Sequence, residues 1–269
     1  MNASTLFEHL WSSYTRITPS ASTIHAQLQA RGESILNDHV ALRTFDLDPI
    51  GLDMLAEPFQ TLGWEPSGNY TFEAKRLNAR SFRPPSPDLP HVFISELRTG
   101  DFSPKLQATA KRLASAAEGR SGTDLLTEHP TWPAVDWATY QALLTESEYA
   151  GWLSVFGLCA NHFTVAVHQL DTFDGLASLN TWLQEQGWPL NDSGGLIKGG
   201  PDVYLAQSST VADRITHTFA CGHTAEIPSC YVEFAQRYPD PSGVLFDGFV
   251  TQSADRIFES THTTQGAKS

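Results

Sequence analysis

The chain of 269 residues is 41% hydrophobic and 17% charged, a composition that supports a globular protein with a large core. Its net charge of −13 argues against binding of nucleic acids or anionic membranes, because those partners need lysine and arginine to neutralise phosphate. It has three cysteines, no signal-peptide pattern and no apolar run of about 18 residues, so we expect a cytoplasmic protein that does not cross a membrane.

The first predicted elements are helices within residues 3–30, with a break at Pro19. An apolar, alternating strand follows at 37–45, "NDHVALRTF". Next comes a helical pattern that stops at Gly63-Trp64, since glycine commonly ends a helix. The apolar residues of this helix are spaced three or four apart, at Leu52, Leu55, Phe59 and Leu62.

The remainder of this first unit reads as strands. The stretches 71–84 and 90–98 alternate or run apolar, which is typical of strands. The proline-rich stretch at 83–90 predicts a loop, because proline cannot donate to a sheet ladder. Helical patterns at 104–118 and 135–159 come next in the chain.

The stretch "ANHFTVAVH" at 160–168 repeats the phrase at 37–45, with an asparagine or aspartate before a histidine that opens an apolar strand. A second helical pattern follows and again ends in Gly-Trp, at Gly187-Trp188. The stretches "DVYLAQSST", "ITHTFACG" and "SCYVEFAQR" then read as strands. We therefore predict that a unit of one strand, one helix and about three strands occurs twice.

His39 and His162 hold equivalent positions in the two units, so a pseudo-two-fold pairing of the units would bring both side chains to one cavity. Aligning "HVFISELR" with "CYVEFAQR" places Ile94 opposite Glu233. A carboxylate in such an apolar strand is costly unless a charge or a metal pairs with it. We therefore predict a metal site made of His39, His162 and Glu233.

The predicted fold class is α+β. Two βαβββ-type modules form a curved sheet around the metal site, with extra N-terminal and inter-module helices. We expect one domain over residues 1–269. Its predicted segments are N-terminal helices at 1–30, a first module at 31–98, a helical insert at 99–159, a second module at 160–240 and a C-terminal cover segment at 241–269.

Two imidazoles and one carboxylate bind Fe(II) in non-haem oxygenases and zinc in hydrolases, so the ligand set leaves both open. A zinc hydrolase or glyoxalase-like lyase would need a general base, for which Glu96 is the best candidate because it lies two residues after Ile94. Glu233 could instead pair with a core arginine, and a non-catalytic small-molecule binder is a further alternative. A zinc site within "CGHTAEIPSC" (221–230) is one ligand short and fits no common finger spacing.

Four stretches, "NDHVALRTF", "ANHFTVAVH", "YVEF" and "GFVTQSADRIFEST", resemble the 2-oxoadipate dioxygenase/decarboxylase family, and the duplicated unit resembles the vicinal oxygen chelate superfamily. The resemblance covers roughly residues 30–262. It implies Fe(II)-dependent conversion of 2-oxoadipate and dioxygen to 2-hydroxyglutarate and carbon dioxide, in lysine catabolism. It also implies that the metal ligands are His39, His162 and Glu233, the set that the repeat predicts.

The resemblance further implies that Arg43, four residues after His39, binds a carboxylate of the substrate. Residues 39, 41 and 43 of a strand share one face, so Arg43 is expected to point into the cavity of His39. A guanidinium grips a carboxylate with two hydrogen bonds. Gln207 is a candidate for a further hydrogen bond to the substrate, or else an outward polar residue.

The expected cofactor is Fe(II), although zinc or nickel could replace it in a crystal because both bind more tightly. The expected partners are a small 2-oxoacid and dioxygen, with no nucleic acid and no membrane. The C-terminal stretch "FDGFVTQSADRIF" is expected to cover the cavity, either as a fixed cover or as a moving lid, with Gly243 and Gly248 as positions where it can bend. The oligomeric state is not specified by any pattern in the chain.

Overall fold

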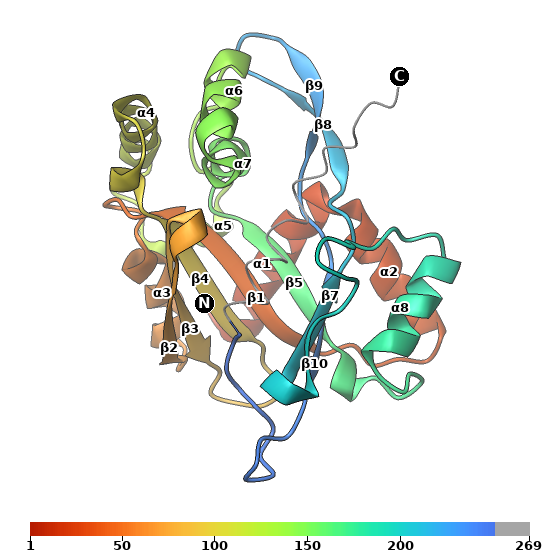
Figure 1. The fold of residues 1–269 in the computed structure, drawn as a ribbon. Coiled ribbons are helices and arrows are strands. Elements are labelled where there is room, and N and C mark those ends of the chain that lie inside the picture. The colour runs from red at the N-terminus through yellow and green to blue at the C-terminus, as the bar shows by residue number, and fades with distance from the viewer. Residues whose placement is uncertain (251–269) are drawn as a thin grey trace.

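The computed structural model describes residues 1–250, and its centre is a curled, mixed sheet of eight strands in the order β2-β3-β4-β1-β5-β10-β7-β6 (Figure 1). The fold is therefore α+β, as predicted. The strands of this sheet are β1 (Asn37–Phe45), β2 (Glu65–Phe72), β3 (Leu77–Arg83), β4 (His91–Leu97), β5 (Ala160–Ala166), β6 (Lys198–Gly200), β7 (Leu205–Ser209) and β10 (Glu233–Arg237).

The α-helices lie in four parts of the chain: before β1, between β1 and β2, between β4 and β5, and between β5 and β6. The expected break in the N-terminal helices is confirmed, because α1 ends at Ile17 and α2 begins at Pro19, where a missing N–H costs nothing. None of the described helices is long and apolar enough to span a membrane. The α-helices are α1 (Ala3–Ile17), α2 (Pro19–Ala30), α3 (Leu52–Thr61), α4 (Pro104–Ser115), α5 (Gly122–Thr127), α6 (Trp137–Glu146), α7 (Glu148–Phe156) and α8 (Leu176–Glu185).

The two halves of the sheet follow the same path. In the first half β1 pairs in parallel with β4, and β3 and β2 continue antiparallel; in the second half β5 pairs in parallel with β10, and β7 and β6 continue antiparallel. Strands β1 and β5 pair antiparallel and join the halves at the centre. Each half also inserts one helix after its first strand, α3 or α8. The two strands that begin with the repeated histidine phrase are thus neighbours.

One predicted strand lies elsewhere. The stretch at 215–222 forms part of a separate two-stranded ribbon, β8 (Arg214–Thr218) and β9 (Thr224–Pro228), which projects beside α6 (Figure 1). The strand that takes its place in the sheet is β6, a short Lys-Gly-Gly segment without the apolar alternation that marks a strand. Every second residue of β8 is exposed, so this strand lacks the buried face that the main sheet requires.

The core lies between the sheet and the helices that cover one of its faces. Contacts of α1 with β5, of α3 with β4 and of α8 with β7 and β10 bury the apolar side chains of that face. In the central strand β1, Val40 and Leu42 alternate with His39 and Arg43, so the two pairs point to opposite sides of the sheet. Because successive side chains point to opposite sides of a strand, packing of Val40 and Leu42 against the helices directs His39 and Arg43 to the concave face.

Candidate metal centre

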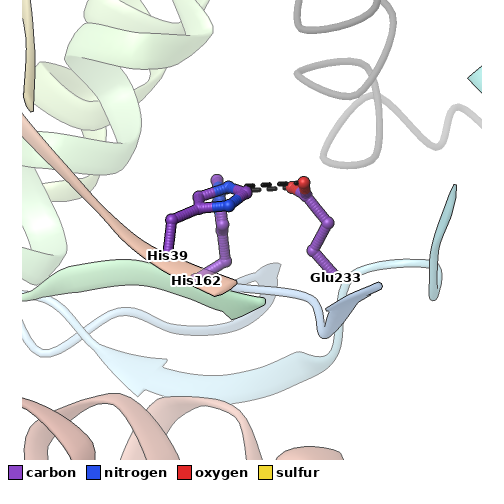
Figure 2. A group of neighbouring side chains, drawn as sticks. All are labelled: His39, His162 and Glu233. Atoms are coloured by element: carbon purple, nitrogen blue, oxygen red, sulfur yellow. Dashed lines mark ion pairs between the residues drawn. The ribbon is translucent and has the colours of Figure 1, made fainter. Parts of the chain in front are cut away.

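Three neighbouring central strands each contribute one residue to a single point on the concave face. His39 comes from β1, His162 from β5 and Glu233 from β10, and their exposed fractions are 2%, 4% and 1%. The strand register explains why the three side chains lie together, because Thr164 of β5 pairs with both His39 and Glu233. Figure 2 shows the two imidazole rings directed at the carboxylate. The prediction that the repeat brings both histidines to one site agrees with this geometry.

The distances fit a small cation. His39 Nε2 lies 3.5 Å from Glu233 Oε1, and His162 Nε2 lies 3.2 Å from Glu233 Oε2. One ligand atom from each residue lies within 4.8 Å of the others. An ion about 2.0–2.2 Å from each atom needs separations of this order. Among the described residues this is the group of histidine, cysteine and acidic side chains that is arranged to hold a metal ion.

The residue before each histidine fixes the ring. Asp38 Oδ1 accepts from His39 Nδ1 at 2.7 Å, and Asn161 Oδ1 accepts from His162 Nδ1 at 3.0 Å. With the proton on Nδ1, each Nε2 presents a lone pair toward Glu233, which is the form that binds a metal. The repeated Asp-His and Asn-His pairs therefore place the histidine and its orienting partner side by side in the chain.

Asp38 is held in turn by Arg237, which donates to both of its oxygens at 2.6 and 2.8 Å. Burial would raise the pKa of Asp38, but the charge of Arg237 and the hydrogen bonds from His39 and Arg237 hold that pKa far below its usual range. Asp38 is therefore an anion that polarises His39. The sequence analysis did not identify Asp38 or Arg237 as part of the site. Asp38 is next to His39 in the sequence and could have been noticed, whereas Arg237 lies 199 residues away from Asp38.

The buried charges favour an ionised carboxylate, and they shift the pKa values of the two histidine rings in opposite directions. Burial raises the pKa of Glu233, yet the nearby His162 and His39 and a hydrogen bond from Gln207 lower it overall. Burial lowers the pKa of His162 to about 3, so this ring is neutral near pH 7. Burial also acts to lower the pKa of His39, but hydrogen bonds and charges from Asp38 and Glu233 raise it overall.

Gln207 contacts the metal centre through Glu233. Its Nε2 donates to Glu233 Oε1 at 2.6 Å, and the side chain is buried. The outward orientation considered from the sequence is therefore wrong. The hydrogen bond fixes one carboxylate oxygen and leaves the other directed at His162.

Arg43 lies on the face of His39, as expected from their spacing, and is 3% exposed. Its guanidinium carbon lies 5.0 Å from the ring centre of Tyr149 and 5.1 Å from that of Trp152. Both aromatic residues come from α7. Arg43 also lines a cavity of about 250 Å³ beside Arg76. The aromatic rings hold the guanidinium in place through cation–π contacts.

The described end of the C-terminal segment lies against the centre. The ring of Phe249 is 4.9 Å from the ring of His39 and 4.9 Å from that of Phe93. Arg237 donates to the carbonyl oxygens of Phe246 and Gly248, so the arginine that holds Asp38 also holds this segment. The rest of the predicted cover segment, 251–269, lies outside the described residues.

Two predictions made from the sequence need correction: the residue equivalent to Glu233, and the position of Glu96. Ala41 and Thr164, each two residues after a histidine, pair with Phe93 and Glu233, so the residue equivalent to Glu233 is Phe93 rather than Ile94. Strand alternation then places Glu96 on the opposite face, where it accepts from the backbone N–H of Leu52 at the start of α3. Glu96 is therefore not a general base at this centre.

The cysteine-containing stretch does not form a second metal group within residues 1–250. Cys230 is fully buried, whereas Cys221 is exposed. The thiols therefore lie in different environments, and the alternative zinc site is not supported.

Comparisons with known proteins agree with this architecture. A family model described as 2-oxoadipate dioxygenase/decarboxylase matches residues 2–121 and 107–243. The chain is 36% identical to a rice (Oryza sativa subsp. japonica) 2-oxoadipate dioxygenase/decarboxylase named as chloroplastic/amyloplastic, over 97% of this chain and 79% of that protein.

Two solved structures are similar over most of the chain. The hydroxyglutarate synthase of Oryza sativa in complex with 2-oxoadipate is 35% identical with a TM-score of 0.90, over 97% of this chain and 92% of the other. A protein from Shewanella frigidimarina, described as a candidate hydrolase, is 45% identical with a TM-score of 0.85, over 92% and 97% of the two chains. This chain therefore belongs to the 2-oxoadipate dioxygenase/decarboxylase family of enzymes.

Proposed function

We propose that the protein converts 2-oxoadipate and dioxygen to 2-hydroxyglutarate and carbon dioxide with Fe(II) as cofactor. The observation that carries the proposal is the buried group of two histidines and one glutamate, in a chain that belongs to a dioxygenase/decarboxylase family. The reaction is balanced, since both oxygen atoms of dioxygen enter the products: one in the carboxylate that forms at the keto carbon, the other in the new hydroxyl group.

His39, His162 and Glu233 would hold the ion. They fit Fe(II), because two imidazoles and one carboxylate on one side of an ion leave three adjacent positions open. When bound, Fe(II) supplies the redox chemistry with dioxygen that no side chain can supply. Asp38 and Asn161 keep the proton on Nδ1 of each ring, and Gln207 orients the carboxylate.

Arg43 would bind the carboxylate of the 2-oxoacid that is distant from the metal. It lies on the face of His39 and is held by the rings of Tyr149 and Trp152. A guanidinium at a fixed distance from the metal would select a dicarboxylic substrate of matching length. Gln207 could also meet the substrate from its place beside Glu233.

Water would be excluded by the aromatic side chains around the ligands. Phe249 and Phe93 pack together beside His39, and Tyr70 packs on both. A dry site strengthens the attraction between the substrate carboxylate and Arg43, because water no longer screens it. We propose that residues 241–269 act as the cover of this site.

The same strand path in both halves supports a duplicated, vicinal oxygen chelate-type architecture. We propose a single domain in which modules 31–98 and 160–240 share the metal, flanked by N-terminal helices at 1–30 and separated by the insert at 99–159. A role in lysine catabolism and a cytoplasmic location stay predictions, since the rice relative is named as chloroplastic/amyloplastic.

Oxygen consumption by the Fe(II)-loaded protein against 2-oxoacids of four to seven carbons tests the proposal. We expect the fastest consumption with 2-oxoadipate, and equal amounts of carbon dioxide and 2-hydroxyglutarate. Equal rates with monocarboxylic 2-oxoacids would contradict the role of Arg43. A zinc-loaded protein that acts without dioxygen would contradict the dioxygenase itself.

A further inference from the structure

The hydroxyl group of Tyr231 is fully buried and makes no hydrogen bond with the described part of the chain. Two other fully or largely buried tyrosines behave differently. Tyr14 Oη donates to the Tyr231 carbonyl oxygen at 2.7 Å, and Tyr149 Oη donates to the Ser95 carbonyl oxygen at 2.7 Å. A buried hydroxyl without a partner costs free energy, so folded proteins rarely retain one without a reason.

The position of Tyr231 places it in the metal centre. It lies two residues before Glu233, and residues two apart in an extended segment face the same side. Its ring stacks on the ring of His162, with 5.0 Å between centroids and 26° between planes. The side chain therefore extends along the concave face beside one of the ligands.

The strand register places Tyr231 on the Arg43 side of the metal centre. Strand β1 pairs antiparallel with β5, whereas β10 pairs in parallel with β5. The step back from Glu233 to Tyr231 therefore runs in the same direction along the sheet as the step from His39 to Arg43. A phenol hydroxyl at this position can donate a hydrogen bond to a group that Arg43 also holds.

A substrate carboxylate can accept more than the two hydrogen bonds that an arginine fork donates, since its two oxygens offer about four acceptor sites. We propose that Tyr231 Oη donates a hydrogen bond to the substrate carboxylate that Arg43 binds. The inference rests on the proposed function and adds a substrate-contacting residue to it. The missing partner of the hydroxyl is then the substrate itself.

The variant Tyr231→Phe removes the hydroxyl and keeps the ring that stacks on His162. With 2-oxoadipate we expect kcat/KM to fall about 10- to 100-fold, mainly through KM, as for loss of a hydrogen bond to a charged group. With 2-oxohexanoate, which has the same length but no distal carboxylate, variant and wild type should agree within about 2-fold. An equal loss on both substrates would overturn the proposal.

Two measurements do not depend on turnover. Calorimetric titration of the anaerobic Fe(II)-loaded protein should show that Tyr231→Phe binds 2-oxoadipate about 10-fold or more weakly. The free protein should keep its Tm or gain in Tm, because the hydroxyl has no partner to lose. Tyr14→Phe is the matched control, which should lower Tm because it removes a formed hydrogen bond.

The outcomes separate this inference from the proposed function. A wild type that neither consumes oxygen with 2-oxoadipate nor binds it overturns both. An active wild type that Tyr231→Phe matches in KM and affinity overturns only the role of Tyr231. A fall in Tm equal to that of Tyr14→Phe would show a structural partner for the hydroxyl, and would also overturn it.

Discussion

The two halves of the sheet follow one strand path but carry different side chains at equivalent positions. Both begin with a histidine at the site, His39 or His162, preceded by Asp38 or Asn161. The second half adds the carboxylate of Glu233 where the first half has Phe93. The first half adds Arg43 four residues after its histidine, where the second half has Ala166.

The two halves therefore carry side chains of opposite charge at the site. In the proposed function, the second half supplies the negative group that would offset a metal cation, and the first half supplies the positive group that would bind a carboxylate. A single half holds only one histidine, which is too few ligands for a metal site. On the proposed function, the backbone repeat places the metal ligands, and the divergence of single side chains gives the two halves opposite charges at the site.

The largest expected effect comes from removing the charge of Glu233, which makes the second half neutral where the first half has Phe93. Glu233→Gln keeps the shape of the side chain but loses its charge. We expect metal affinity and kcat/KM to fall by more than about 100-fold, because loss of even an outer partner of a ligand costs about 10- to 100-fold. Metal content after dialysis measures the effect, and full retention of one metal ion per chain would contradict it.

Removing the positive group of the first half should separate substrate binding from metal binding. Arg43→Ala should lose about 2–3 kcal/mol, or about 30- to 150-fold in kcat/KM, with dicarboxylic 2-oxoacids. Arg43→Lys keeps the charge but loses the planar fork, so it should also be impaired. Both variants should bind the metal like the wild type. Unchanged turnover of 2-oxoadipate by Arg43→Ala would remove this residue from the site.

Asp38→Asn makes the orienting residues of the two halves alike. We expect about 10-fold weaker metal binding, since an amide polarises His39 less than a carboxylate does. The variant also leaves Arg237 without its anion, and removing one partner of a buried ion pair costs as much as about 3–5 kcal/mol. Denaturant unfolding and a metal titration measure the two effects. Asn161→Ala is the comparison in the other half, and it should not affect Arg237.

Glu96→Gln should have the smallest effect, because Glu96 lies on the face away from the centre. We expect kcat/KM within about 2-fold of the wild type. A loss beyond about 10-fold would restore Glu96 as a general base and favour a hydrolase or lyase.

The stability of Glu96→Gln relative to the wild type should depend on pH, and the pKa of Glu96 fixes the direction of the change. Burial raises the pKa of Glu96 above its ordinary 4.5, so folding favours its protonated form. That contribution to stability is present below pH 4.5 and is lost as pH rises through the raised pKa. Glu96→Gln cannot undergo this loss, so its stability relative to the wild type should increase with pH above 4.5. Urea unfolding at several pH values measures the difference.

Local patterns predicted the site better than they predicted the sheet. The repeated histidine phrase and the carboxylate in an apolar strand indicated His39, His162 and Glu233, because a strand period of two fixes which residues share a face. The alignment with Ile94 was wrong by one residue, since unequal loops hide the register until the strands pair. Such a shift moves a side chain to the other face, which is why Glu96 was misplaced.

Contacts between distant parts of the chain were beyond sequence reasoning. The ion pair of Asp38 with Arg237 joins β1 to the end of β10, and no local pattern marks it. Strand β6 was missed because Lys-Gly-Gly has no strand-type alternation. Its place in the sheet depends on pairing with β7, which is a tertiary effect.

A metal titration of the wild type beside His39→Ala and His162→Ala tests most directly whether the two halves share one ion. The metal-free proteins are titrated anaerobically with Fe(II), and affinity and stoichiometry are measured for each. The shared site predicts one tightly bound ion per wild-type chain and a similar, large loss of affinity in both variants. Binding by either variant with the affinity of the wild type would show that its histidine is no ligand, and would contradict a centre built from both halves.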